Sequence, residues 1–199
     1  MHIKNINITV SYRCLQAGTT IDLEQITLLV GEQGTGKSTI LDALVSISQG
    51  KCPKYISTEL TEKAMAEGVD CFYFNTEKDN PRVKDAQLYS TPSGQDKGIG
   101  TRAALMSRFQ SHGEVIKAFT IDPITEAKDC ILLIDEPESG LSIRNQYLLS
   151  RTIHEAAQRN VQFIVATHCI PLIESVNKVY SLEHREWLSP AEFINRSKS

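Results

Sequence analysis

The chain has 199 residues and a mass of 22.2 kDa, a size that suits one domain built around a single core. Its 41% hydrophobic and 23% charged residues are ordinary for a globular protein and exclude a disordered or fibrous chain. The formal net charge of -3 offers no global positive field for nucleic acid, although a local basic patch would not show in this count. The five cysteines are widely spaced and odd in number, which argues against a paired zinc or redox motif.

The sequence also carries no sign of a membrane segment or a secretion signal. No run of apolar residues approaches the roughly 18 that a membrane span needs. The first five residues, MHIKN, do not begin the basic and then apolar pattern of a signal peptide. The sequence therefore predicts a cytoplasmic protein.

In the first half of the chain, β-branched segments alternate with helical ones. The run ITLLV at 26–30 is short, apolar and followed by glycines, which is typical of a buried strand in a parallel sheet. The expected elements, in chain order, are extended segments at 3–12 and 20–30, a helix from Lys37 to about Ser48, a short polar helix at 58–67 capped by Ser57 or Thr58, and a strand at 69–75.

The second half begins with a polar stretch at 76–100, whose composition predicts a long mobile loop. The expected elements after it are helical segments at 101–109 and from 114 to about 121, a polar connector, an apolar strand at 130–135, an amphipathic helix at 143–160 with a stripe of Tyr147, Leu148, Ile153 and Ala157, a strand at 161–166 and a last strand at 179–182. Strands that alternate with helices predict a single-domain α/β layered fold with right-handed crossovers.

The strongest motif is GEQGTGKS at 31–38, which matches the phosphate-binding P-loop pattern and stands between an apolar strand and a helix. Glycines let successive backbone N–H groups turn toward phosphate, and the following helix N-terminus favours an anion. We expect Lys37 to neutralise the β- and γ-phosphates and the Ser38 hydroxyl to ligate Mg²⁺. The predicted nucleotide-binding residues here are Gly31, Glu32, Gln33, Gly34, Thr35, Gly36, Lys37, Ser38 and Thr39.

Two adjacent carboxylates follow the apolar strand ILLI at 131–134. Asp135 suits the Mg²⁺ shell, either directly or through water, and Glu136 can act on the attacking water as a general base. Such a pair alone is more often a solvated strand end, but the P-loop some 100 residues upstream favours a catalytic pair. Thr167 and His168 end another apolar strand, and an imidazole placed there can sense the γ-phosphate.

The order of these motifs resembles that of the ABC-type ATPases. The P-loop, Asp-Glu-Pro at 135–137, ESGLS at 138–142 and Thr167-His168 are similar to the two Walker motifs, the D-loop and the switch histidine of that family. The resemblance implies ATP and Mg²⁺ as ligands, with catalytic roles for Glu136, Lys37 and His168. It also implies a three-layer P-loop NTPase core of mainly parallel strands, with an N-terminal antiparallel β portion and a helical and loop insertion at about 50–115.

A member of this family also carries a signature segment that presents a helix N-terminus to the partner subunit's γ-phosphate. PSGQ at 92–95 resembles the common form, but the residues behind it would begin a poor helix. SHGE at 111–114 opens directly into a helical pattern, so Ser111, Gly113 and Glu114 are the signature residues that we expect. This variant resembles the small stand-alone ATPases related to the SMC and DNA-repair branch.

Three positions depart from the family pattern or stay open. The family usually has a glutamine after the strand at 69–75, and Glu77 is a candidate substitute, although a solvated loop residue explains it equally well. Ser142 stands where the D-loop aspartate is usual. Near the N-terminus, Tyr12 could stack on adenine or Arg13 could contact phosphate, and either residue could simply lie at a strand edge.

The resemblance implies a homodimer that forms around ATP and drives or regulates an unidentified protein partner. The alternatives are the ATP-binding subunit of a membrane transporter and a nucleotide-dependent binding switch with little turnover. A complete SMC-type machine is excluded because no long heptad-patterned segment separates P-loop and signature. A P-loop kinase is disfavoured by Asp-Glu-Pro and Thr-His. Nothing in the sequence identifies the cellular process.

Overall fold

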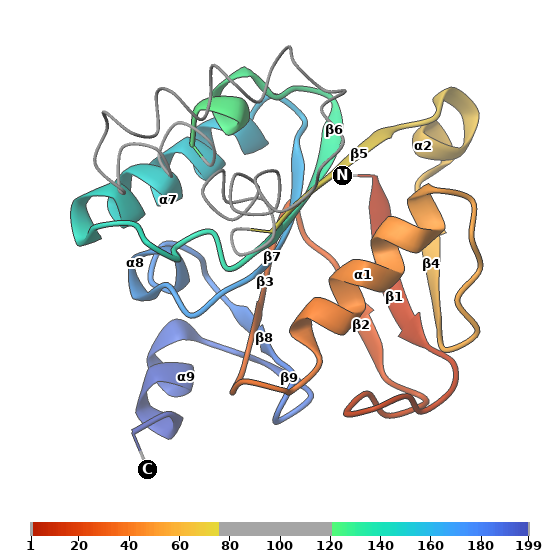
Figure 1. Cartoon of the computed structure of the whole chain (residues 1–199), viewed down its shortest axis with the longest axis horizontal. Coiled ribbons are helices and arrows are strands. Elements are labelled where there is room, and N and C mark those ends of the chain that lie inside the picture. Colours follow the sequence, from red (N-terminus) through yellow and green to blue (C-terminus); the bar gives the residue numbers. More distant parts are fainter. Residues whose placement is uncertain (1, 76–120, 199) are drawn as a thin grey trace, which may run out of the picture.

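The computed structural model describes residues 2–75 and 121–198, which form two β-sheets flanked by helices (Figure 1). The larger sheet has the strand order β5-β6-β7-β3-β8-β9, and the smaller has the order β2-β1-β4. The strands are β1 Ile3–Ile8, β2 Thr20–Asp22, β3 Ile26–Val30, β4 Ile56–Leu60, β5 Asp70–Asn75, β6 Cys130–Asp135, β7 Gln162–Ala166, β8 Val179–Ser181 and β9 Glu186–Leu188. All pairs in the larger sheet are parallel except β8 with β9, whereas the smaller sheet is antiparallel.

Helices cover both faces of the larger sheet, which is why its central strands are largely apolar. The helices are α1 Lys37–Ser48, α2 Glu62–Glu67, α7 Ile143–Ala157, α8 Ile170–Ile173 and α9 Pro190–Arg196. Along β3, successive side chains point to opposite faces, so Leu28 packs toward α7 and α8 while Leu29 packs toward α1. Figure 1 shows α7 and α8 on one side of the sheet, with α1 and the smaller sheet on the other.

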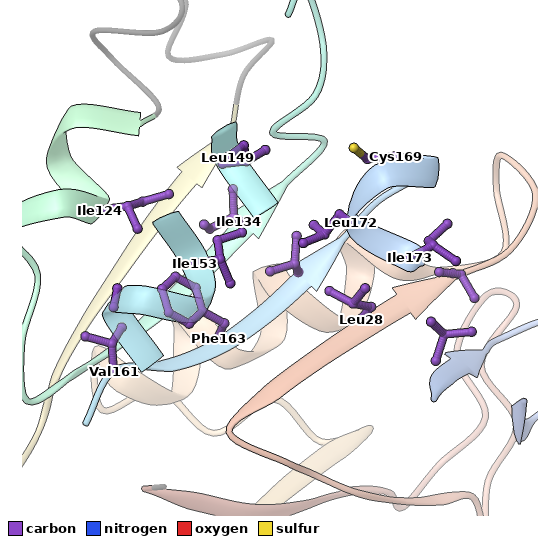
Figure 2. Packing of buried hydrophobic residues seen from close by; sticks show 14 of the residues in the cluster. Leu28, Ile124, Ile134, Leu149, Ile153, Val161, Phe163, Cys169, Leu172 and Ile173 are labelled. Carbon is purple, nitrogen blue, oxygen red and sulfur yellow. The ribbon is translucent and has the colours of Figure 1, made fainter. Parts of the chain in front are cut away.

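The core between the larger sheet and α7 is built by side chains from four elements. Figure 2 shows Leu28 of β3, Ile134 of β6 and Phe163 of β7 facing Leu149 and Ile153 of α7. All five side chains are buried. Close packing of this kind fixes the spacing of β3, β6 and β7, and so fixes where their ends lie.

One buried amide joins the two sheets. The side chain of Gln162, at the start of β7, accepts hydrogen bonds from the backbone N–H groups of His2 and Ile3 at 2.8 and 2.7 Å. Its amide group donates to the carbonyls of Ile3 and Glu24 at 2.8 and 3.2 Å. Gln162 has no exposed surface. These bonds therefore supply hydrogen-bond partners both to its buried amide and to the backbone groups of His2, Ile3 and Glu24.

The architecture predicted from the sequence is confirmed: a mostly parallel core sheet, helices on both faces and an antiparallel N-terminal portion. Of the predicted insertion at about 50–115, residues 50–75 supply β4 to the smaller sheet and β5 to the larger, and residues 76–115 lie outside the described part of the chain. Within the described residues, no helix has the length and hydropathy required to cross a bilayer.

Four local predictions are wrong. The helix predicted at 58–67 is split, because Ile56–Leu60 pairs with β1 as a strand and α2 begins only after its N-cap, Thr61. The residues expected to form a polar connector include a helical stretch at 121–126. Tyr147 and Leu148 are exposed on α7, whose buried face is centred instead on Leu149, Ile153 and Ala156. The strand at β8 is not the last, because β9 pairs with it as an antiparallel edge.

Candidate functional site

The register of the core sheet brings the predicted chemical residues to one edge. Leu29 of β3 and Asp135 of β6 both lie beside Ala166 of β7, and Asn75 of β5 lies beside Asp135. These strands are parallel, so their carboxyl ends meet at the same edge of the sheet. The P-loop, the carboxylate pair and the Thr167-His168 pair therefore emerge side by side, although they are far apart in sequence.

The P-loop conformation depends on glycine at defined positions. Gly31, Gly34 and Gly36 all have positive φ angles, of 139°, 85° and 103°. Gly36 is also crowded, since a Cβ atom there would lie 2.8 Å from Cδ2 of Leu15. As the N-cap residue of α1, Gly36 has no side-chain oxygen to offer to the first turn. The amides of that turn and the helix dipole thus remain suited to an anionic ligand.

Lys37, the first residue of α1, lies buried beneath this loop with 5% of its surface exposed. Its Nζ donates hydrogen bonds to the carbonyl oxygens of Gly31 and Glu32 at 2.8 and 3.0 Å. Burial lowers the pKa of Lys37, and the carboxylates of Glu136 and Asp135 act in the opposite direction. The loop therefore holds the ammonium group where it faces both the P-loop and the carboxylate pair.

A cavity of about 350 Å³ lies between the P-loop and the ends of β5 and β6. Its walls are formed by Arg13, Cys14, Gln33, Gly34, Gly36, Lys37, Ser38, Thr39, Asn75, Asp135 and Glu136. Gly31, Glu32 and His168 line a neighbouring cavity, and Thr35 lines a third beside Gln33 and Gly34. The predicted signature residues Ser111, Gly113 and Glu114, like Glu77, lie outside the described residues.

Asp135 is held by neighbours from the adjacent strand. Its Oδ2 accepts a hydrogen bond from Nδ2 of Asn75 at 3.0 Å, and the Tyr73 hydroxyl lies 3.5 Å from the same oxygen. Burial is the main cause that raises the pKa of Tyr73 to about 12, so this phenol stays protonated and can donate. The sequence analysis did not select Asn75, because its only sequence signal is a polar residue at the end of a predicted strand, and the pairing of that strand with β6 is seen only in the structure.

Glu136 adopts a backbone conformation that is uncommon outside glycine. Its φ angle is 51°, in the left-handed region, and its backbone N–H donates to the carbonyl of Ala166 at 2.9 Å. This conformation turns the chain away from β6 directly after Asp135. The Glu136 Oε1 lies 3.9 Å from Nε2 of His168, with both side chains partly exposed to solvent. The two side chains are therefore neighbours, and both are accessible to solvent.

Comparisons with known proteins agree with this arrangement. The family described as AAA ATPase domain matches residues 1–91. A protein of Methanosarcina acetivorans, named as an ABC transporter ATP-binding protein, is 25% identical over 197 residues, covering 81% of this chain and 70% of that protein. A nucleotide-free ATP-binding cassette from an ABC transporter aligns with a TM-score of 0.59 at 14% identity, covering 100% of this chain and 96% of that one. The chain has the ABC ATPase cassette fold.

Two further structures show how widely this fold occurs. The dimeric post-hydrolysis state of the cassette MJ0796, bound to ADP and Pi, has a TM-score of 0.53 at 13% identity over 95% of this chain and 98% of that one. The SMC head domain from Thermotoga maritima has a TM-score of 0.51 at 14% identity over 91% and 94%. At these identities the solved structures establish the fold of this chain, which is that of an ABC ATPase cassette.

The cassette contains a carboxylate contact that the sequence analysis missed. Glu138 lies in the loop after β6, and its Oε2 accepts a hydrogen bond from the Thr167 hydroxyl at 2.8 Å. Its Oε1 accepts a second hydrogen bond, from the backbone N–H of His168. Neither bond has a local sequence signal, because the partners are 29 and 30 residues apart and meet only through the β6 and β7 pairing.

Tyr12 and Arg13 lie in the same N-terminal turn but have different surroundings. Tyr12 stacks on Tyr55, with ring centroids 4.2 Å apart and an interplanar angle of 15°. Arg13 has a φ angle of 53° and lines the P-loop cavity together with Cys14. The turn packs against the P-loop through Leu15, which touches the position of Gly36. Arg13 is thus the member of the pair that faces the cavity.

Proposed function

We propose that this chain binds ATP with Mg²⁺ and hydrolyses it in a site completed by a second copy of the chain. The carrying observation is that the P-loop residues Lys37 and Ser38 line one cavity together with Asp135 and Glu136. A triphosphate needs cations and amides, and its hydrolysis needs a group that activates water. The cavity is lined both by the phosphate-binding residues of the P-loop and by Glu136, which can activate water.

On the phosphate side, the P-loop amides and Lys37 hold the triphosphate. The N-terminus of α1 supplies N–H groups and a favourable dipole, and Lys37 supplies a positive charge beside them. Arg13 is proposed as an additional phosphate contact, because it lines the same cavity. Since these groups bind ground-state phosphate, changes here should act mainly on nucleotide affinity.

The residues around Asp135 fit a magnesium ion. Ser38 offers a hydroxyl and Asp135 a carboxylate, which are the oxygen donors that Mg²⁺ prefers, and both line the same cavity. Asn75 fixes the orientation of Asp135 through the 3.0 Å hydrogen bond to Oδ2. When bound by Ser38 and Asp135, the ion would neutralise negative charge that develops on the phosphate.

Glu136 is the proposed general base. It directly follows Asp135, lines the cavity and is partly exposed, so its carboxylate can reach a water molecule next to the γ-phosphate. His168 faces Glu136 at 3.9 Å from the neighbouring loop, which suits a group that senses the γ-phosphate. After transfer of the water proton to Glu136, the hydroxide attacks phosphorus and ADP leaves.

The partial exposure of Glu136 and His168 supports a site that a second subunit covers. The helices that follow their loops begin with exposed apolar residues, Ile143 on α7 with 70% and Ile170 on α8 with 44% of their surface accessible. The MJ0796 cassette is dimeric in its post-hydrolysis state. We infer that the partner's signature segment, predicted at Ser111, Gly113 and Glu114, closes the site, and that a monomer hydrolyses ATP slowly.

The test is Glu136→Gln, which keeps the shape of the base but removes its ability to accept a proton. We expect kcat to fall about 1,000-fold, within the range for losing a general base, and light scattering to show a stable dimer with MgATP. Glu155→Gln, on the exposed face of α7, is the matched control and should behave as the parent. A monomeric parent with full activity at every protein concentration would contradict the proposal.

A second role is favoured by the relative's name. The Methanosarcina acetivorans protein is named as an ABC transporter ATP-binding protein, so this chain could energise a membrane partner with the same site. Affinity capture with the ATP-trapped Glu136→Gln protein separates the roles. Recovery of an integral membrane protein supports a transporter subunit, whereas a stable ATP complex whose parent shows negligible turnover supports a binding switch.

A further inference from the structure

The carboxylate of Glu138, in the loop after β6, forms hydrogen bonds to the loop after β7. Glu138 accepts hydrogen bonds from the Thr167 hydroxyl and from the His168 backbone N–H. Thr167 is fully buried, and its Oγ1 also accepts a hydrogen bond from the backbone N–H of Cys169 at 2.9 Å. Three consecutive residues that begin the segment leading into α8 are therefore tied, directly or through Thr167, to Glu138.

Backbone hydrogen bonds also hold the loop that carries Glu138. The backbone N–H of Ser139 donates to the carbonyl of Glu136 at 3.1 Å, and that of Leu141 donates to the carbonyl of Glu138 at 2.9 Å. Ser142 then caps α7 by accepting from the N–H of Asn145 at 3.4 Å. Glu138 thus links a fixed turn, which begins at the proposed base, to the backbone of the facing histidine.

Glu138 is near enough to Lys37 for its carboxylate to oppose the lowering of the Lys37 pKa. It is not among the described residues that line the P-loop cavity, whereas Glu136, two positions earlier, is. Burial is the main influence on the Glu138 carboxyl and raises its pKa, so the chain keeps a desolvated acid here at a cost. A half-buried acid whose two oxygens each accept a hydrogen bond from the histidine loop is suited to positioning that loop.

We propose that Glu138 is a positioning residue for ATP turnover, which holds the backbone of His168 so that its imidazole faces Glu136. The inference rests on the proposed ATPase function. It predicts that Glu138 acts on the catalytic step through His168 and contributes little to nucleotide affinity. Glu138→Ala should therefore lower kcat about tenfold, since small displacements of a catalytic group reduce rates strongly, while KM for MgATP changes less than about twofold.

Glu138→Gln is the conservative variant that should restore turnover. Its carbonyl oxygen can accept from the His168 N–H, and its amide can donate to the second lone pair of the Thr167 hydroxyl. Both contacts survive without the negative charge, so kcat should stay within about twofold of the parent. A glutamine variant as slow as the alanine variant would show that the charge itself is used, which contradicts a positioning role.

A double-mutant cycle with His168→Ala gives the sharpest test. If Glu138 works only through His168, adding Glu138→Ala to His168→Ala should change kcat by less than about twofold. A further loss of about tenfold in the double variant, relative to His168→Ala alone, would overturn the inference while leaving the ATPase function intact. A parent chain with no MgATP turnover at all would overturn the proposed function and this inference with it.

A structural readout that needs no turnover completes the test. In the folded parent protein, the His168 amide proton should resonate far downfield and exchange slowly, because it donates to the half-buried carboxylate of Glu138. Glu138→Ala should move this resonance upfield and speed its exchange, and Glu138→Gln should have a smaller effect. An unchanged His168 amide in a folded Glu138→Ala protein would overturn the proposal.

Discussion

The two walls of the site are built in different ways. The phosphate side is a single continuous segment, 31–39, whose geometry depends on glycine backbones and on the start of one helix. The hydrolytic side is assembled from three strands: Asn75 from β5, Asp135 and Glu136 from the end of β6, and His168 from the loop after β7. One wall is therefore a local structure, and the other exists only because the sheet pairs those strands in this register.

This difference predicts where mutations act. On the phosphate side the hydrogen bonds are local, since Lys37 donates to the carbonyls of Gly31 and Glu32 in the same loop, so a substitution should change nucleotide affinity and disturb mainly this loop. On the hydrolytic side, side-chain hydrogen bonds hold the reactive groups in place, as between Asn75 and Asp135 or Glu138 and Thr167. A substitution there should change the catalytic step or the metal requirement, and its effects should depend on the partner residue.

The largest expected change in nucleotide affinity is on the phosphate side. Lys37→Ala removes the buried ammonium, and ATP affinity should fall about 100-fold, the size expected for losing charge-assisted contacts worth roughly 2.7 kcal/mol. Lys51→Ala, an exposed lysine just beyond α1, is the control and should bind like the parent. Titration calorimetry with ATP measures both. Equal affinity of Lys37→Ala and the parent would refute a phosphate-binding role for this wall.

A smaller effect is expected from the residue that orients Asp135. Asn75→Ala removes the 3.0 Å hydrogen bond, and the Mg²⁺ concentration for half-maximal ATPase activity should rise about tenfold, as for other groups behind a metal ligand. ATP binding without Mg²⁺ should not change. Tyr73→Phe, which removes the longer 3.5 Å contact, should raise the requirement less than about twofold. The opposite order would show that the tyrosine, not Asn75, orients Asp135.

The smallest effect concerns stability rather than activity. Burial raises the folded-state pKa of Glu138 above its ordinary value of 4.5, so the folded chain binds this proton more tightly than the unfolded chain. The ionised carboxylate therefore costs stability above the folded-state pKa, and the cost fades as pH falls through it. Glu138→Gln should raise Tm at about pH 8 by no more than about 2–4 °C, the shift for 1 kcal/mol in a domain this size.

The control for this stability effect is Glu155→Gln, which changes an exposed carboxylate on α7. Thermal unfolding followed by circular dichroism measures both variants. The gain in Glu138→Gln should shrink as the pH is lowered toward 4.5, where the parent carboxyl is protonated in the folded state. A gain that is the same at both pH values would contradict the assigned cause.

The sequence alone determined the phosphate side and the central strands. Glycine spacing, a following helix pattern and short apolar runs are local features, so β3, α1, β6 and β7 could be predicted to within a residue or so. It also determined that Asp135 and Glu136 end a core strand. These predictions hold because strands that are buried on both faces need apolar residues at nearly every position, and such short runs are visible in the sequence.

Tertiary structure decided everything that depends on which strands become neighbours. Residues 58–60 lie in the predicted helix at 58–67, but pairing with β1 makes Ile56–Leu60 a strand. Tyr147 belongs to the predicted apolar stripe of the helix at 143–160, but α7 turns Leu149 and Ile153 toward the sheet instead. The contacts of Asn75 and Glu138 arise because parallel strands from distant parts of the chain end together. Spacing along the chain contains no record of that register, and only the packed sheet brings those side chains within hydrogen-bonding distance.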